Sequence, residues 1–97
     1  MKTTADYIEL LRRYKEQNAK NYGILSMGIF GSVARGEQKE GSDIDIYIEG
    51  EPQSLLTMAH IKGELETLFE CKVDLIRLRE RMNAFLKRRI MEEGIYV

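Results

Sequence analysis

The sequence predicts an α+β fold in which a small β-sheet of about three strands is flanked by helices. Three segments carry apolar residues at helical spacing, and three short runs rich in β-forming residues lie between them. The chain has one proline and no internal repeat or low-complexity tract, so nothing marks a linker. Its 97 residues suffice for one hydrophobic core but not two. We therefore expect a single domain over residues 1–97.

The chain is expected to begin with a helix over residues 4–20. Thr3 or Thr4 can cap its start, and Gly23 supplies the left-handed conformation that commonly ends a helix. The apolar run at residues 24–30 then predicts the first strand. The residues that recur at helical spacing in the first helix are Tyr7, Leu10, Leu11 and Tyr14.

A polar loop at residues 36–42 leads into the second strand, expected over residues 43–49. Polar and apolar residues alternate strictly along this strand, so one face is apolar and the other polar. We expect the strand to be half buried. The apolar face consists of Ile44, Ile46 and Ile48, and the polar face of Asp43, Asp45, Tyr47 and Glu49.

The rest of the chain predicts a helix, a third strand over residues 72–78 and a closing helix that ends near Gly94. Gly63 weakens the first of these helices by roughly 1 kcal/mol relative to alanine. The expected buried stripes are Leu55, Met58, Ala59, Leu65, Leu68 and Phe69 in the first helix, and Met82, Phe85, Leu86 and Ile90 in the closing helix.

Two aspartates share the polar face of the second strand. Alternate strand residues point the same way, which places Asp43 and Asp45 about 7 Å apart. Two like charges on one face repel unless a cation lies beside them, and carboxylate oxygens suit Mg²⁺. The alternative is a solvent-facing polar strand.

Asp74 interrupts the third strand, which is apolar on both faces, and an unpaired buried carboxylate is costly there. An ion pair with Lys72 or Arg77 is one solution. The other is that Asp74 joins Asp43 and Asp45 as a ligand of a two-metal site, in which two cations hold the attacking and leaving oxygens.

The dipeptide Gly31-Ser32 follows the first strand and precedes a segment, residues 32–35, that can form one helical turn. Glycine lets the backbone approach an anion, and the serine hydroxyl and exposed N–H groups donate to phosphate oxygens. Arg35 suits a pyrophosphate leaving group. The alternatives are an ordinary strand-ending turn and a solvated arginine.

The segment GSVARGEQKEGSDID resembles the G-S-x10-D-x-D signature of the DNA polymerase beta-like nucleotidyltransferase superfamily. The length, the leading helix, the strand before Gly31 and the later V-D-L-I segment are similar to the minimal nucleotidyltransferase family. This resemblance implies a mixed sheet and Mg²⁺-dependent nucleotidyl transfer with two metal ions. It also implies that Asp74 is the third catalytic and metal-binding aspartate beside Asp43 and Asp45. The nucleotide-binding set is then Gly31, Ser32, Arg35 and Ser42.

Members of that family are commonly antitoxins of HEPN ribonuclease toxins. The resemblance implies transfer of AMP from ATP to a tyrosine of such a toxin. Two alternatives stay open: an antitoxin that neutralises its toxin by binding alone, and nucleotidyl transfer to a different protein or a small molecule.

Charge and cysteine content narrow the possible binding partners and the cellular location. Fifteen Lys and Arg oppose sixteen Asp and Glu, so the net charge of −1 gives no general attraction to nucleic acid or anionic lipid. The basic segment at residues 77–89 is interpreted as a solvated helix face, and we do not expect direct nucleic-acid binding. The lone Cys71 and the lack of an apolar signal or membrane segment predict a cytoplasmic protein. A homodimer stays open.

Overall fold

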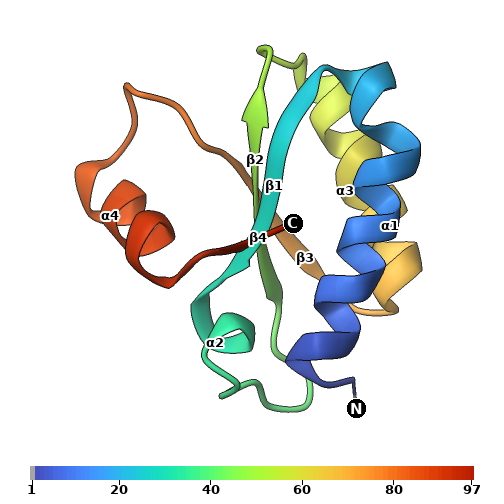
Figure 1. Ribbon diagram of the computed structural model, residues 1–97, viewed down its shortest axis with the longest axis vertical. Helices are drawn as coiled ribbons and strands as arrows, with labels where there is room; N and C mark the ends of the chain where they lie inside the picture. Colours follow the sequence, from blue (N-terminus) through green and yellow to red (C-terminus); the bar gives the residue numbers. More distant parts are fainter. Residues whose placement is uncertain (1) are drawn as a thin grey trace.

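The computed structural model describes residues 2–97 and confirms the α+β fold (Figure 1). The sheet has four strands rather than about three, because the last two-residue strand is too short to show an alternating pattern. In chain order the elements are α1 (Thr4–Tyr22), β1 (Ile24–Phe30), α2 (Gly31–Ala34), β2 (Ile44–Gly50), α3 (Leu55–Phe69), β3 (Val73–Arg77), α4 (Ala84–Glu93) and β4 (Ile95–Tyr96).

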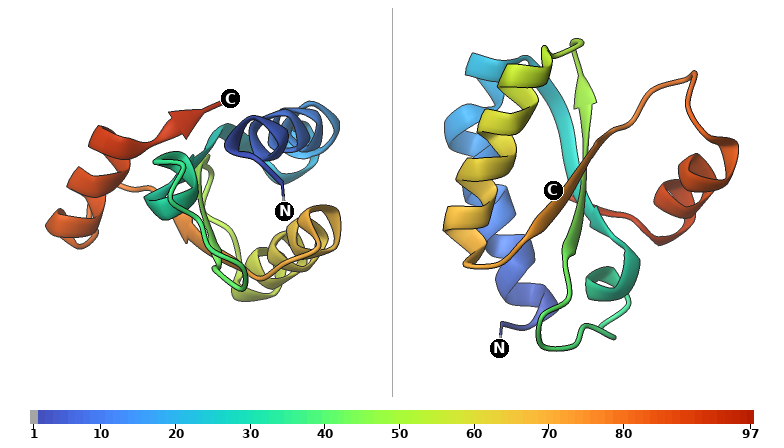
Figure 2. Two further views of the ribbon diagram at one scale, coloured as in Figure 1. Left: turned by 90° about the horizontal axis from the view of Figure 1, so that it is seen from below. Right: turned by 180° about the vertical axis from the view of Figure 1, so that it is seen from behind.

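The sheet is mixed, with strand order β3-β2-β1-β4. The β2–β3 pair is parallel, whereas β1 pairs antiparallel with β2 and with β4. The two long helices α1 and α3 cover one face, and α2 and α4 lie on the other side of the sheet (Figures 1 and 2). The two faces of β2 therefore meet different surroundings, and the second face is the one that concerns function.

Local signals explain where α1 begins and ends. The Thr3 hydroxyl accepts a hydrogen bond from the Asp6 N–H, and the Asp6 carboxylate accepts one from the Thr3 N–H, which forms a capping box. The helix continues past its predicted end to Tyr22, because the left-handed Gly23, with φ of 66°, is the residue that stops it. Among residues 2–97, no helix combines the length and apolar character that crossing a membrane requires.

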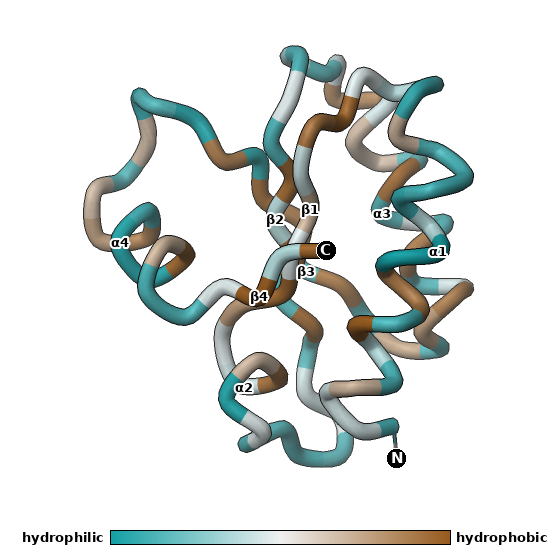
Figure 3. Tube along the Cα trace, in the orientation of Figure 1, coloured by the Kyte–Doolittle hydropathy of each residue, from teal (hydrophilic) through white to brown (hydrophobic). Residues whose placement is uncertain are grey.

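The main core lies between the sheet and the helices α1 and α3. Ile44, Ile46 and Ile48 are at most 2% exposed there, as the alternation predicts. Figure 3 shows apolar residues concentrated along the strands. A second, smaller cluster lies on the opposite face, where Tyr47 packs with Ile90 of α4. The prediction that β2 is half buried is therefore wrong at Tyr47, which is 5% exposed, because α4 folds back over the polar face.

The buried stripes of α3 and α4 differ from the predicted ones. Ala59 lies about 120° around α3 from Leu65, and it is exposed together with Leu55, which is 90% exposed. Phe85 lies about 140° around α4 from Ile90 and is 79% exposed. The buried residues of the two helices are Ile61, Leu65 and Phe69 in α3, and Ile90 in α4.

This difference gives a stability prediction on one helix. Leu65→Ala, at a fully buried position, should lower the free energy of unfolding by about 2–5 kcal/mol. Leu55→Ala makes the same chemical change at a solvent-exposed position and should alter it by less than about 0.5 kcal/mol. Urea unfolding followed by circular dichroism measures both. Equal losses in the two variants would contradict the observed placement of α3.

Candidate active site

Asp45 lies in the middle of the candidate site, on the face of β2 that α1 and α3 leave free. It pairs with Phe30 of the antiparallel strand β1 and with Asp74 of the parallel strand β3. Residues paired across a ladder project to the same face of the sheet. Asp45 and Asp74 therefore share one face, as the interpretation of a joint carboxylate site requires.

Gly31 lies directly against the Asp45 carboxylate. A Cβ atom added to Gly31 would overlap Oδ2 of Asp45, and the glycine itself has a left-handed backbone with φ of 74°. Gly31 is also the first residue of α2, which confirms the predicted helical turn after β1 and places Ser32 in that turn. Only a residue without a side chain satisfies both conditions, so the dipeptide Gly31-Ser32 and Asp45 form one structural unit.

The electrostatic surroundings of Asp45 are those of a site that attracts cations. Partial burial raises the pKa of Asp45, and the negative charges of Asp74 and Asp43 raise it further. Arg89 and Arg35 oppose this effect and lower the pKa. The net shift of the Asp45 pKa is upward, chiefly because of burial.

Asp74 occupies a different environment from the one predicted. It is exposed, because β3 is an edge strand of the sheet and water reaches its side chain. The argument that Asp74 is a buried charge in need of a partner is therefore wrong. Within residues 2–97 neither Lys72 nor Arg77 forms an ion pair with it, so the alternative interpretation is not realised either. Asp43 is likewise exposed.

The carboxylates have the right chemistry for a hard divalent cation, because Mg²⁺ prefers oxygen ligands. Asp43 and Asp74 are both close enough to Asp45 to act on its pKa. In the part of the chain that the structure describes, no three or more His, Cys, Asp or Glu side chains gather closely enough to form a complete metal centre.

Two other predicted nucleotide-binding residues are held by neighbours. Arg35 donates from Nε to Glu37 Oε2 at 3.0 Å and from Nη1 to Glu93 Oε2 at 2.9 Å. The Ser42 hydroxyl accepts a hydrogen bond from the Lys39 N–H at 3.1 Å and closes the loop before β2. Arg35 is thus tied to α4 beside the carboxylates, whereas Ser42 organises the loop.

Sequence reasoning missed Arg89 and Glu93. Both belong to α4. The sequence places Arg89 in a basic segment typical of a solvated helix face, yet its positive charge lowers the pKa of Asp45. Their ion pair across one helical turn, Arg89 Nη2 to Glu93 Oε2 at 4.0 Å, is visible in the sequence as an i,i+4 spacing. The return of α4 over the sheet is a tertiary feature that no local pattern reveals.

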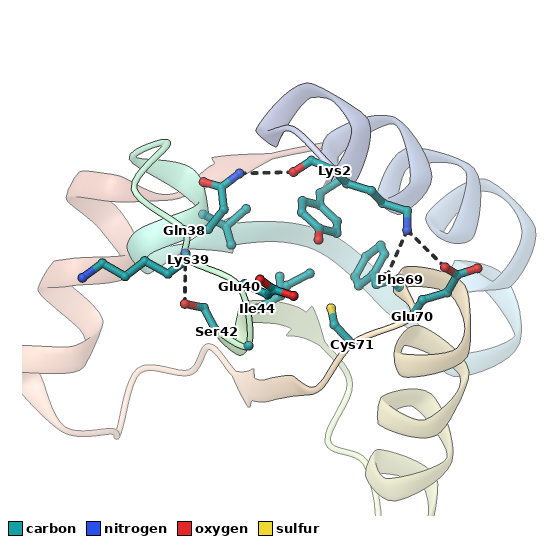
Figure 4. A pocket seen from close by; sticks show the side chains of 12 residues that line it. Lys2, Gln38, Lys39, Glu40, Ser42, Ile44, Phe69, Glu70 and Cys71 are labelled. Carbon is teal, nitrogen blue, oxygen red and sulfur yellow. Dashed lines mark hydrogen bonds and ion pairs between the residues drawn. The ribbon is translucent and has the colours of Figure 1, made fainter.

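A pocket at the end of the sheet adjoins this site and includes Ser42 of the predicted nucleotide-binding set in its wall (Figure 4). Its wall includes Ile44 and Phe69, which belong to the main core on the face of α1 and α3. Lys2 closes one side, with Nζ 3.3 Å from the Phe69 carbonyl oxygen and 3.6 Å from Glu70 Oε2. Ile44 and Asp45 project to opposite faces of β2, so the Asp45 carboxylate does not line this pocket.

Comparison with known proteins finds relatives that share one family. Residues 11–97 match the family described as nucleotidyltransferase domain. A Methanocaldococcus jannaschii protein named "putative protein adenylyltransferase" is 44% identical over 98 residues that span the full length of both chains. The protein adenylyltransferase MntA of Thermococcus cleftensis is 32% identical over 98 residues, which cover all of this chain and 98% of that one.

Solved structures share the fold at lower sequence identity. A toxin-antitoxin complex with AMP-PNP contains a chain that superposes with a TM-score of 0.78 at 21% identity, covering 91% of this chain and 69% of that one. A complex of a tri-AMPylated Shewanella oneidensis HEPN toxin with its MNT antitoxin gives a TM-score of 0.69 at 17% identity, covering 93% and 70% of the two chains.

Proposed function

Because this chain belongs to the minimal nucleotidyltransferases of the DNA polymerase beta-like superfamily and is a nucleotidyltransferase, we propose that it transfers AMP from ATP to a partner protein. The acceptor is a hydroxyl group, a tyrosine of a HEPN-type toxin. We also propose that residues 1–97 form one nucleotidyltransferase domain.

The observation that carries this proposal is the contact between Asp45 and Gly31. It brings a carboxylate of β2 to the backbone at the start of α2, where phosphate oxygens can accept hydrogen bonds from N–H groups. A site for a cation and a site for a phosphate then adjoin each other. Nucleotidyl transfer needs this pairing, because the metal-bound triphosphate must be held while its α-phosphorus is attacked.

Asp43, Asp45 and Asp74 would hold Mg²⁺, which supplies charge neutralisation and acidifies an incoming hydroxyl. Gly31 and Ser32 bind the β- and γ-phosphates. The acceptor oxygen forms a bond to the α-phosphorus while the bond from that phosphorus to the bridging oxygen breaks. Pyrophosphate leaves with the bonding electron pair, and the hydroxyl proton passes to Asp74.

The names of the relatives support a protein acceptor, and the AMPylated toxin of the Shewanella complex supports a HEPN partner. The nucleotide analogue in the other complex supports ATP as the donor. Three aspartates near one another also favour catalysis over binding alone, because a pure binding protein gains nothing from mutually repelling carboxylates.

Incubation of the purified protein with α-labelled ATP, Mg²⁺ and a lysate of its own host tests this function. A labelled protein band on a denaturing gel, absent with the Asp43→Asn/Asp45→Asn double variant, is the expected result. Mass spectrometry of the band then identifies the acceptor and the modified residue. ATP binding without labelled protein would favour an antitoxin that acts by binding, or a small-molecule acceptor.

A further inference from the structure

Two arginines from different elements converge on one carboxylate oxygen beside the candidate active site. Arg35, which caps the end of α2, places Nη1 2.9 Å from Glu93 Oε2, and Arg89 of α4 places Nη2 4.0 Å from the same oxygen. Two guanidinium groups around one anionic oxygen form an arrangement that also suits a phosphate oxygen. The three side chains are 28–48% exposed, so a solvated ligand can reach them.

The same two arginines lie on the side of the aspartates. Ile90, the neighbour of Arg89 in α4, packs in one cluster with Phe30, and Phe30 is paired with Asp45 across β1 and β2. Arg35 follows directly on the helical turn that begins at Gly31, and α2 contacts both β2 and α4. The positive charges of α2 and α4 therefore lie beside the negative charges of β2 and β3.

We propose that Arg89 binds the polyphosphate of the nucleotide together with Arg35, so that α4 supplies part of the substrate site. This inference rests on the proposed function. A nucleoside triphosphate brings several negative charges next to three aspartates, and it binds well only if cationic donors neutralise the side away from them. Each guanidinium has five N–H donors, and Arg35 uses only Nε and one Nη1 donor on the two glutamates. Within residues 2–97 the Arg35 side chain makes no other hydrogen bond, so its remaining donors are available to phosphate.

The affinity of the protein for ATP and for AMP, measured by titration calorimetry with Mg²⁺, tests the proposal. Arg89→Ala should weaken ATP binding by about tenfold or more. The affinity for AMP, which lacks the β- and γ-phosphates, should change by less than about twofold. Arg89→Lys keeps the positive charge but lacks the planar set of guanidinium donors. Its affinity for ATP should lie between those of wild type and Arg89→Ala.

Arg88→Ala is the matched control. Arg88 is the neighbouring residue of α4, it is exposed, and it makes no ion pair with a carboxylate among residues 2–97. ATP affinity of this variant should stay within about twofold of wild type. Equal weakening in the Arg88 and Arg89 variants would mean that only the general positive charge of α4 matters, and it would overturn the proposal.

Two further outcomes would overturn the assignment of Arg89. One is wild-type ATP affinity in Arg89→Ala, and the other is an equal loss of ATP and AMP binding, which indicates a structural role. Failure of the proposed function looks different: wild-type protein then binds ATP in an Arg89-dependent manner but transfers no AMP to protein. Absence of ATP binding by the wild-type protein would overturn the function and this site together.

Discussion

Asp43→Asn or Asp45→Asn is expected to abolish nucleotidyl transfer while the protein remains folded. Each substitution removes a negative charge from the face where Mg²⁺ and the triphosphate are proposed to meet. The loss of a charge-stabilising group at a reacting phosphorus costs about 10²-fold or more in rate. Transfer of α-labelled AMP to the acceptor protein measures the loss, and circular dichroism verifies the fold.

The stability of Asp45→Asn has a predictable sign. The pKa of Asp45 is raised in the folded protein, chiefly by burial, so the ionised carboxylate opposes folding at pH values above that raised pKa. The unfavourable contribution disappears below the ordinary value of 3.8, where the group is protonated in both states. At pH 7 the Tm of Asp45→Asn should therefore equal or exceed that of wild type, and the gain should shrink as the pH falls.

Asp6→Ala provides the opposite control for stability. The pKa of Asp6 is lowered, first by its hydrogen bond from the Thr3 backbone and then by the Thr3 hydroxyl, so its ionised form favours folding. Removing it should reduce the Tm and leave transfer intact, because Asp6 lies in the cap of α1. Undiminished transfer in Asp43→Asn or in Asp45→Asn would refute the metal-binding assignment.

Gly31→Ala should have the second large effect, on both activity and stability. A left-handed backbone costs an alanine about 1–2 kcal/mol, and here the new methyl group would also overlap the Asp45 carboxylate. The carboxylate must move away from the start of α2, which separates the proposed cation and phosphate sites. We expect transfer to fall by about 10²-fold or more and the free energy of unfolding to drop by at least 1–2 kcal/mol.

Gly36→Ala separates the cost of the left-handed backbone from the effect of overlap with Asp45. Gly36 has nearly the same backbone conformation, with φ of 72° against 74°, but an added Cβ atom has nothing within 4 Å. It should show only the conformational cost, about 1–2 kcal/mol, with transfer preserved. Urea unfolding and the labelled transfer assay measure both variants. If Gly31→Ala behaves like Gly36→Ala, the contact with Asp45 has no functional importance.

Local patterns in the sequence were sufficient for the elements that hold the motif. The apolar run at residues 24–30 coincides with β1, and the glycine and serine after it begin the short helix α2. Strict alternation placed Asp45 on the face away from the isoleucines, because strand geometry has a period of two, whereas Asp43 lies one residue before β2 begins. These features depend on neighbours in the chain, which a single sequence displays.

Predictions of features that depend on contacts between distant segments were wrong, or the features were missed. The apolar sequence around Asp74 predicts a strand buried on both faces, yet β3 forms the sheet edge and Asp74 is exposed, since strand order is decided by pairing across the whole domain. Tyr47 belongs to a polar alternation but is buried by Ile90 of α4. The position of Arg89 near Asp45 is also a consequence of the return of α4 over the sheet. The return of the closing helix therefore accounts for two of these three differences.

The closing helix is also the least firmly attached wall of the site. Ile90 is the one fully buried residue of α4, and the two-residue strand that follows is paired with Gly28 and Ile29 of β1. The α1 and α3 side of the sheet holds a separate and larger cluster. Detaching α4 therefore breaks few contacts and leaves the main core closed, in the manner of a small cooperative unit that opens below the free energy of global unfolding. If Arg89 binds the polyphosphate as proposed, opening of α4 would release that end of the nucleotide without unfolding of the main core.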